Sequence, residues 1–178
     1  MKVLITGAAG FIGSQLLEAL AVQHPEWTLI ASDIRPLNPQ ALRPNVEAAL
    51  LDIGKREAVL AAVAQHQPDA IVHLASVVTP PPGMGEDVLH TIDVEGTRSI
   101  LQAAVEHGVR QLIVTSSGAA YGYYPENAEW IDEHDPLRGH SKFAYAKHKR
   151  EVEEMLAQAR VKHPELRQLI LRPGTILG

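Results

Sequence analysis

The sequence predicts a doubly wound α/β fold, in which helices cover both faces of a parallel β-sheet. Short apolar runs alternate with helical patterns along its 178 residues, as in repeated strand–helix–strand units. The first run, Val3-Leu4-Ile5, leads into three spaced glycines, and an acid, Asp33, closes the second run about twenty residues later. The length suits one hydrophobic core, so we expect residues 1–178 to form one domain.

The first strand runs into the turn Thr6-Gly7-Ala8-Ala9-Gly10-Phe11-Ile12-Gly13, which opens the first helix. Gly7 permits a sharp turn, Gly10 lets the backbone approach a ligand without a Cβ in the way, and Gly13 lets helix and strand pack closely. The free N–H groups and the positive dipole end of the helix then face an anion. The turn therefore predicts a pyrophosphate-binding site.

Asp33 ends the second predicted strand. A carboxylate there can accept hydrogen bonds from both hydroxyls of an adenine ribose, and it repels a 2′-phosphate. This favours NAD over NADP as the cofactor, although Arg35 is near enough in the chain to compensate a phosphate in part. The alternative is that Asp33 is only a turn residue before Pro36.

The later elements continue the alternation. Pro68 and Pro164 each end a helix just before a strand, and His107-Gly108 is a typical helix stop because glycine tolerates a left-handed cap. The loop with Pro80-Pro81-Pro82-Gly83 follows the fourth strand, on the ligand side of a doubly wound sheet. The predicted strands are 2–6, 27–33, 46–51, 69–74, 110–116 and 166–171, and the predicted helices are 11–23, 54–66, 86–107 and 140–160.

Two further segments carry side chains suited to proton transfer. Tyr145 and Lys149 are four residues apart on the last predicted helix, so they share a face about 6 Å apart along its axis. A nearby ammonium group favours the phenolate of a tyrosine, whose pKa is otherwise about 10. Thr115-Ser116-Ser117 ends the fifth strand and offers hydroxyls to the same substrate oxygen. Each segment alone is more often a solvated face or a turn, but their order behind the glycine turn and Asp33 favours a catalytic site.

The composition excludes several other classes. There are 16 basic and 21 acidic residues and no basic cluster, so we expect neither nucleic acid nor an anionic membrane surface as a partner. The chain has no cysteine, and its nine histidines are scattered, so we predict no disulfide and no metal site. It contains no apolar run long enough to cross a bilayer and no convincing signal peptide, so we expect a cytoplasmic protein.

Together these motifs resemble the short-chain dehydrogenase/reductase superfamily, in particular its extended branch of UDP-glucose 4-epimerase-like NAD-dependent epimerases and dehydratases. The turn at 6–13 is similar to the TGxxGxxG phosphate loop of that branch, and Tyr145 and Lys149 fall on its YxxxK pair. The segment 116–122 is similar to the serine-bearing segment and puts the active hydroxyl at Ser117. The resemblance spans essentially the whole chain and implies a Rossmann fold.

The resemblance also implies roles and partners. Tyr145 would exchange a proton with the substrate oxygen, Ser117 would polarise that oxygen, and Lys149 would keep Tyr145 acidic and bind the nicotinamide ribose. The substrate would be a nucleotide sugar or a similar small alcohol or carbonyl compound, and helices at 86–107 and 140–160 would pair in a homodimer. The implied cofactor-binding residues are Gly7, Ala9, Gly10, Phe11, Ile12, Gly13, Asp33, Asp52, Ile53, Leu74, Ala75, Ser76, Tyr145, Lys149 and Pro173.

Two departures from the family bear on function. Asp93 stands where the family usually has asparagine, which either changes the charge near the active centre or keeps the same local hydrogen bond. Family members continue well beyond Leu171-Arg172-Pro173-Gly174 into a substrate-selecting lobe, so we interpret the chain as truncated, with that lobe missing. The sequence thus predicts an NAD-dependent epimerase or dehydrogenase; the alternative is a non-catalytic or truncated module that binds NAD without turnover.

Overall fold

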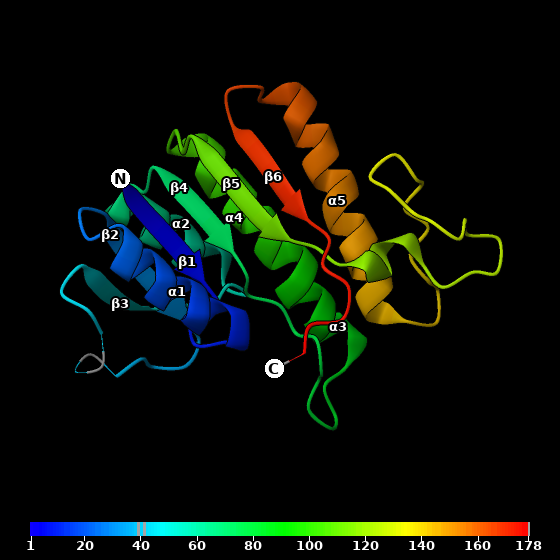
Figure 1. Cartoon of the computed structure of the whole chain (residues 1–178), viewed down its shortest axis with the longest axis horizontal. Coiled ribbons are helices and arrows are strands. Elements are labelled where there is room, and N and C mark those ends of the chain that lie inside the picture. Colours follow the sequence, from blue (N-terminus) through cyan, green and yellow to red (C-terminus); the bar gives the residue numbers. More distant parts are fainter. Residues whose placement is uncertain (39, 41, 178) are drawn as a thin grey trace.

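A computed structural model describes residues 1–38, 40 and 42–177 and shows a six-stranded sheet in the order β3-β2-β1-β4-β5-β6, with every neighbouring pair parallel (Figure 1). This is the strand order of a doubly wound sheet, and it reverses between β1 and β4, where such sheets bind ligands. The strands are β1 (Lys2–Thr6), β2 (Thr28–Asp33), β3 (Val46–Leu50), β4 (Ala70–His73), β5 (Gln111–Thr115) and β6 (Arg167–Leu171).

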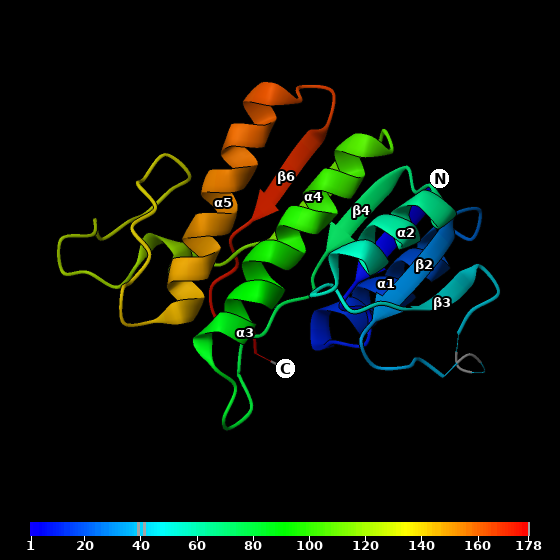
Figure 2. The same cartoon turned by 180° about the vertical axis from the view of Figure 1, so that it is seen from behind.

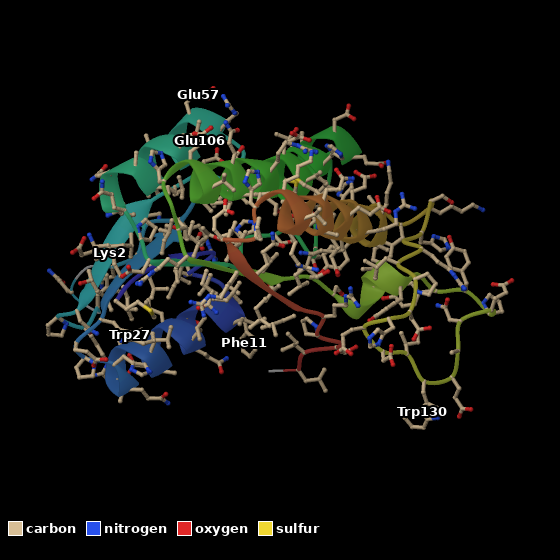
Figure 3. All side chains as sticks on the ribbon, turned by 90° about the horizontal axis from the view of Figure 1, so that it is seen from above. Lys2, Phe11, Trp27, Glu57, Glu106 and Trp130 are labelled. Atoms are coloured by element: carbon tan, nitrogen blue, oxygen red, sulfur yellow. The ribbon has the colours of Figure 1, made fainter. Side chains whose placement is uncertain are left out.

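Helices lie on both faces of the sheet, as predicted, but unequally. Seen from above, α1 lies on one side and α2, α4 and α5 lie on the other (Figure 3), and the view from behind shows these last three side by side (Figure 2). The helices are α1 (Phe11–Gln23), α2 (Arg56–His66), α3 (Glu86–His90), α4 (Gly96–Glu106) and α5 (Ala144–Lys162), with a 3₁₀ turn at Gly118–Tyr121.

The alternation of side chains along the strands divides the core between these two faces. Val3 and Ile5 of β1 pack in the cluster with α1, whereas Leu4 between them belongs to the larger cluster on the other face. On the α1 face the outer strands are less well covered: Leu169 of β6 pairs in register with Ile113, which packs against the α1 cluster, yet Leu169 is 47% exposed.

The long helix predicted at 86–107 is not a regular α-helix. It is α3 and α4 joined by a π-helical turn at Thr91–Glu95. A π turn holds one residue more than an α turn, and such insertions are frequent at functional sites. The structure thus corrects the prediction of one uninterrupted helix.

Two other helix starts differ from the prediction. The last helix begins at Ala144 instead of 140, because Phe143 is in an extended conformation and its N–H bonds to the His140 carbonyl in a turn. The second helix begins at Arg56 instead of 54, because the Asp52 side chain accepts the Gly54 N–H and forms a turn of its own. The glycine at Gly108 does adopt a positive φ of 67° after α4, as the helix-stop signal indicates.

We predict that Gly13→Ala destabilises the fold. A Cβ on Gly13 would overlap the carbonyl oxygen of Gly7 and lie 2.8 Å from the Ala8 Cα, both of them backbone atoms that cannot move aside cheaply. We expect a loss of about 1–3 kcal/mol in the free energy of unfolding, measured by urea denaturation. Gly85→Ala is the matched control, because a Cβ at Gly85 meets nothing within 4 Å. Equal stability of the two variants would contradict this account of the packing.

Candidate active site

Two adjoining cavities lie at the carboxyl ends of the strands. The β2-side cavity, of about 360 Å³, is lined by Asp33 and Asp52 among others, and the α5-side cavity, of about 700 Å³, by Ser117, Tyr145 and Lys149. Both are lined by Gly7, Gly10, Leu74 and Ser76, so they form one continuous crevice over the glycine turn. Its position is the point where the strand order reverses.

The glycine turn is packed directly against the end of β4. Gly7 has a φ of 72°, and a Cβ there would stand 2.8 Å from the Ala75 backbone nitrogen. The Gly10 N–H donates to the Gly7 carbonyl at 3.0 Å, which closes the turn before α1. Because neither Gly7 nor Gly10 has a side chain, the turn presents its backbone to the crevice, which is the form of a site for a diphosphate.

Asp33 is held by the protein at the end of β2. Its Oδ2 accepts the Ala9 N–H at 3.0 Å, and its Oδ1 accepts the Arg35 backbone N–H at 2.9 Å. The Arg35 guanidinium folds back and donates to the Ala9 carbonyl at 2.6 Å. The turn role and the ligand-facing role of Asp33 therefore coexist, since a carboxylate oxygen accepts more than one hydrogen bond and Asp33 lines the β2-side cavity.

A buried imidazole joins the segments under the crevice. His73 Nδ1 lies 2.7 Å from Thr6 Oγ1, and Nε2 lies 3.0 Å from Thr97 Oγ1. The Thr97 hydroxyl donates a hydrogen bond to the Asp93 carbonyl at 2.6 Å, so it can only accept one from His73, which assigns the ring proton to Nε2. Thr6 in turn donates to Nδ1 and accepts the Ala75 N–H at 3.3 Å. Burial, with the charge of Lys149, lowers the pKa of His73 to about 3, so the ring is neutral.

The side chains suited to proton transfer meet at the first turns of α5. The Lys149 Nζ lies 5.4 Å from the centre of the Tyr145 ring and donates to the Thr115 carbonyl at 3.1 Å. Ser117 begins the 3₁₀ turn, and its Oγ accepts the Ala119 N–H. Burial raises the pKa of the Tyr145 phenol, and the Ser117 hydroxyl beside it lowers it. The arrangement can hold a substrate oxygen between a hydroxyl and a phenol.

Comparison with known proteins agrees with this geometry. The NAD dependent epimerase/dehydratase family model matches residues 3–178. The chain belongs to this family. The dependence of this family on NAD confirms the cofactor prediction at the level of the family. The strand order and the parallel pairing confirm the predicted doubly wound sheet.

Relatives in the family carry out several related reactions. The chain is 33% identical over 99% of its length to N-acetyl-alpha-D-glucosaminyl-diphospho-ditrans,octacis-undecaprenol 4-epimerase of Escherichia coli O157:H7, and 35% identical over 82% to uronate dehydrogenase of Pseudomonas putida. It superposes on the Thermus thermophilus UDP-glucose 4-epimerase complex with NAD with a TM-score of 0.79 and 28% identity, covering 97% of this chain and 54% of that one. The chain spans about half the length of the curated relatives it matches: 49% and 51% of these two.

Most residues that the family resemblance assigns to the cofactor line the crevice. Ala9 differs: within the part of the chain that the structure describes, it lines neither cavity, and its N–H is used by Asp33. Residues that the sequence did not single out also line the crevice, from the β4–α3 loop and from the segment after β6. They include Val77, Met84, Thr175 and Ile176.

The expected effect of Lys149 on Tyr145 is not seen. The sequence predicts that the ammonium group lowers the pKa of the phenol, whereas that pKa is raised, because burial dominates. Burial likewise lowers the pKa of Lys149. The spacing on the helix correctly placed the two groups together, but it carries no information on how deeply they are buried.

A buried ion pair beneath the site was missed by sequence reasoning. Arg172 bonds to Glu153 on α5 at 2.6–3.0 Å and donates to the Tyr121 hydroxyl at 2.6 Å. Ser116 donates to the same carboxylate, and hydrogen bonding to Glu153 raises the pKa of Arg172. The four-residue spacing of Tyr145, Lys149 and Glu153 is the signal that could have found it. This network fixes α5 against the strand ends that carry the hydroxyls.

The described residues include neither a bilayer-spanning helix nor a cluster of metal-binding side chains. None of the helices there combines the length and apolar character needed to cross a bilayer. Nor do three or more histidine, aspartate or glutamate side chains gather there as a metal site would require.

We predict that His73 makes the fold sensitive to acid. The ring has its ordinary pKa of 6.5 in the unfolded chain and a pKa of about 3 in the folded one. The contribution of the neutral ring to the free energy of unfolding is therefore full above pH 6.5 and is lost as the pH falls toward 3. The slope is about 1.4 kcal/mol per pH unit. In urea denaturation, the stability gap between the wild type and His73→Gln should therefore narrow by about 2 kcal/mol from pH 6.5 to pH 5.

His107→Gln is the control for this measurement, because His107 is exposed at the end of α4. Its stability should follow that of the wild type at every pH. A gap between the wild type and His73→Gln that stays constant across this range would show that the buried ring is not the acid-sensitive group.

Proposed function

We propose that residues 1–178 are the NAD-binding Rossmann domain of an enzyme that moves a hydride between nicotinamide and a hydroxyl-bearing carbon. The observation that carries this proposal is that one cavity, the α5-side cavity, is lined by Tyr145, Lys149 and Ser117 and also by the glycine turn and Pro173. Members of the family include both NAD-dependent epimerases and dehydrogenases, which supports an oxidoreductase or epimerase chemistry.

The residues of the crevice fit a dinucleotide. The glycine turn presents backbone N–H groups at a helix start, and Asp33, Asp52 and Ile53 line the β2-side cavity, where an adenosine would lie. The carboxylate of Asp33 would accept the ribose hydroxyls. Leu74, Ala75 and Ser76 would run past the phosphates and the ribose.

At the other end of the crevice, NAD would supply the hydride acceptor and an added positive charge near the phenol. Tyr145 exchanges the proton on the substrate oxygen, and Ser117 donates a hydrogen bond to that oxygen. Lys149 would hold the nicotinamide ribose, and the positive charge of the bound cofactor would favour the phenolate of Tyr145. Pro173, which lines the same cavity, would flank the nicotinamide.

The substrate class we propose is a nucleotide sugar or a similar small alcohol or carbonyl compound. This is supported by the names of relatives: one solved relative is a UDP-glucose 4-epimerase, and a curated one is a uronate dehydrogenase. The segment Ser117-Gly118-Ala119 lacks the acidic residues that dehydratases of the branch often carry, so we do not propose dehydration.

We also propose that the chain forms a homodimer through the helices at 86–107 and 140–160. A shallow groove of about 320 Å³ runs between α4 and α5 on the face away from the sheet. Leu101 and Val105 of α4 and Met155 of α5 line it, among polar side chains. Sedimentation of the purified chain tests this pairing, and a monomer at all concentrations would contradict it.

For the cofactor, we predict that the wild type binds NAD more tightly than NADP in calorimetry. Asp33→Asn should reduce this preference, because it removes the charge that repels a 2′-phosphate. Asp87→Asn is the control, since Asp87 is exposed on α3, outside both cavities. Tighter binding of NADP by the wild type would overturn the role of Asp33.

For the chemistry, we predict that Tyr145→Phe lowers turnover by about 10²–10⁴-fold while leaving the affinity for NAD nearly unchanged, because only the proton-transfer group is lost. Turnover is followed as NADH absorbance with a uronate and as epimerisation with UDP-glucose. Tyr124→Phe is the control, because Tyr124 lies outside the residues that line the two cavities and its ring stacks on His140.

Two results would count against the acid–base role or the enzyme itself. A Tyr145→Phe variant with most of its activity intact would show that another group moves the proton. A wild-type chain that binds NAD but turns over none of these compounds would favour the alternative, a dinucleotide-binding module without turnover. One observation supports this alternative: the chain spans only 49% and 51% of the length of the two curated relatives named above.

A further inference from the structure

Behind the Tyr145–Lys149 pair lies a buried carboxylate. Asp93 stands in the π turn, and its side chain is 3% exposed. One oxygen, Oδ1, accepts the Ser76 hydroxyl at 2.9 Å and the Val77 N–H at 3.0 Å. Asp93 thereby holds the loop that lines both cavities of the crevice.

The other carboxylate oxygen of Asp93 faces a buried histidine. His148 Nδ1 lies 3.8 Å from Asp93 Oδ2, and the ring is 1% exposed. Within the described residues, neither ring nitrogen of His148 has a hydrogen-bond partner. Buried polar atoms are rarely left in this state, so this ring calls for an explanation that packing alone does not give. His148 directly precedes Lys149 on α5, and neither Asp93 nor His148 has a role in the chemistry proposed above.

The charge of Asp93 reaches both groups of the catalytic pair. Burial lowers the pKa of Lys149, and Asp93 opposes this by raising it. Burial raises the pKa of Tyr145, and Asp93 raises it further. Burial lowers the pKa of His148, and Asp93 is the largest opposing influence. One carboxylate thus favours the protonated form of all three neighbours.

An asparagine, which the family usually has at this position, would keep part of this arrangement. Its carbonyl oxygen could accept the same two hydrogen bonds from Ser76 and Val77. It would carry no charge, so its influence on the protons of Tyr145, Lys149 and His148 would be lost. The two explanations of Asp93, a harmless exchange and a change of charge, therefore make different predictions.

We propose that Asp93 is a positioning residue for the Tyr145–Lys149 end of the crevice: its buried carboxylate fixes the loop at Ser76 and Val77 and also faces buried His148, the neighbour of Lys149 on α5. Protonation of His148 then cancels the charge of this carboxylate. The inference rests on the proposed function only in giving that pair its catalytic role. Other titratable groups, on α3 and on α5, also face Asp93 and His148. They are Glu86, His90, Lys147 and Glu151, and His90 is itself bonded to Glu151 at 3.1 Å.

The test follows the protons directly by NMR, in the chain without cofactor or substrate. Histidine ring and ¹³C-tyrosine signals are titrated with pH in the wild type and in Asp93→Asn, and Tyr145→Phe and His148→Phe assign the two signals. We expect the pKa values of His148 and of Tyr145 both to move downward in Asp93→Asn, because the negative charge that favours their protonated forms is gone. Glu95→Gln is the control: it removes a charge from the same π turn, but its side chain is 47% exposed and should shift neither signal.

A second measurement needs no folded Asp93→Asn variant. In the wild type, the Tyr145 ring signal should show an inflection at the pH where His148 titrates, and this inflection should vanish in His148→Phe. Unmoved titrations of both residues in Asp93→Asn, or no inflection in the wild type, would overturn the proposal. Neither measurement involves turnover, so this inference and the proposed function can fail separately. The expected pKa changes in an inactive protein would support this inference and contradict the proposed function. An active protein without these pKa changes would support the proposed function and contradict this inference.

Discussion

The arrangement of the crevice depends on one buried, neutral imidazole. His73 ends β4, accepts a hydrogen bond from the Thr6 hydroxyl at the end of β1 and donates one to the Thr97 hydroxyl on α4. The Thr97 hydroxyl donates a hydrogen bond to the Asp93 carbonyl in the π turn, so each donor of this network has one acceptor. A protonated ring could not accept from Thr6. The same ring thus joins three elements: the strand that leads into the glycine turn, the strand that leads into the Ser76 loop, and α4.

A second buried network, of opposite character, secures the other end of the crevice. Glu153 and Arg172 are charged and paired, and they join α5 to the segment after β6. Gly118 adds a backbone bond to the Pro173 carbonyl at 3.0 Å, so the 3₁₀ turn is attached to that same segment. Removing the Arg172 guanidinium would leave the buried Glu153 carboxylate without its counter-charge, which is costly. The neutral network lies beneath the glycine turn, and the charged one supports the side of the crevice that carries Ser117, Tyr145 and Lys149.

Much of this architecture is predictable from local pattern. Strand positions follow from the apolar runs, and the turn at Gly7 follows from glycine spacing, because both are set by residues close in sequence. The π turn could not be predicted, since its residues have no distinctive local pattern and its geometry is stabilised by contacts such as that of Asp93 with Ser76. The predicted direction of the Tyr145 pKa shift was wrong for the same reason. The spacing of Tyr145 and Lys149 is a local feature of the sequence, whereas the burial that raises this pKa depends on the whole fold.

The π turn has a consequence for chain length. In a regular helix each residue advances the side-chain direction by about 100°. The extra residue in the π turn between α3 and α4 therefore changes which residues of α3 and of the turn face the core. The packing of α4 itself is unchanged. A deletion of one residue here would leave helix content almost the same and rotate the Asp93 carboxylate away from its hydrogen-bond donors. The number of residues in this segment, and not only their identity, determines which charge stands behind the crevice.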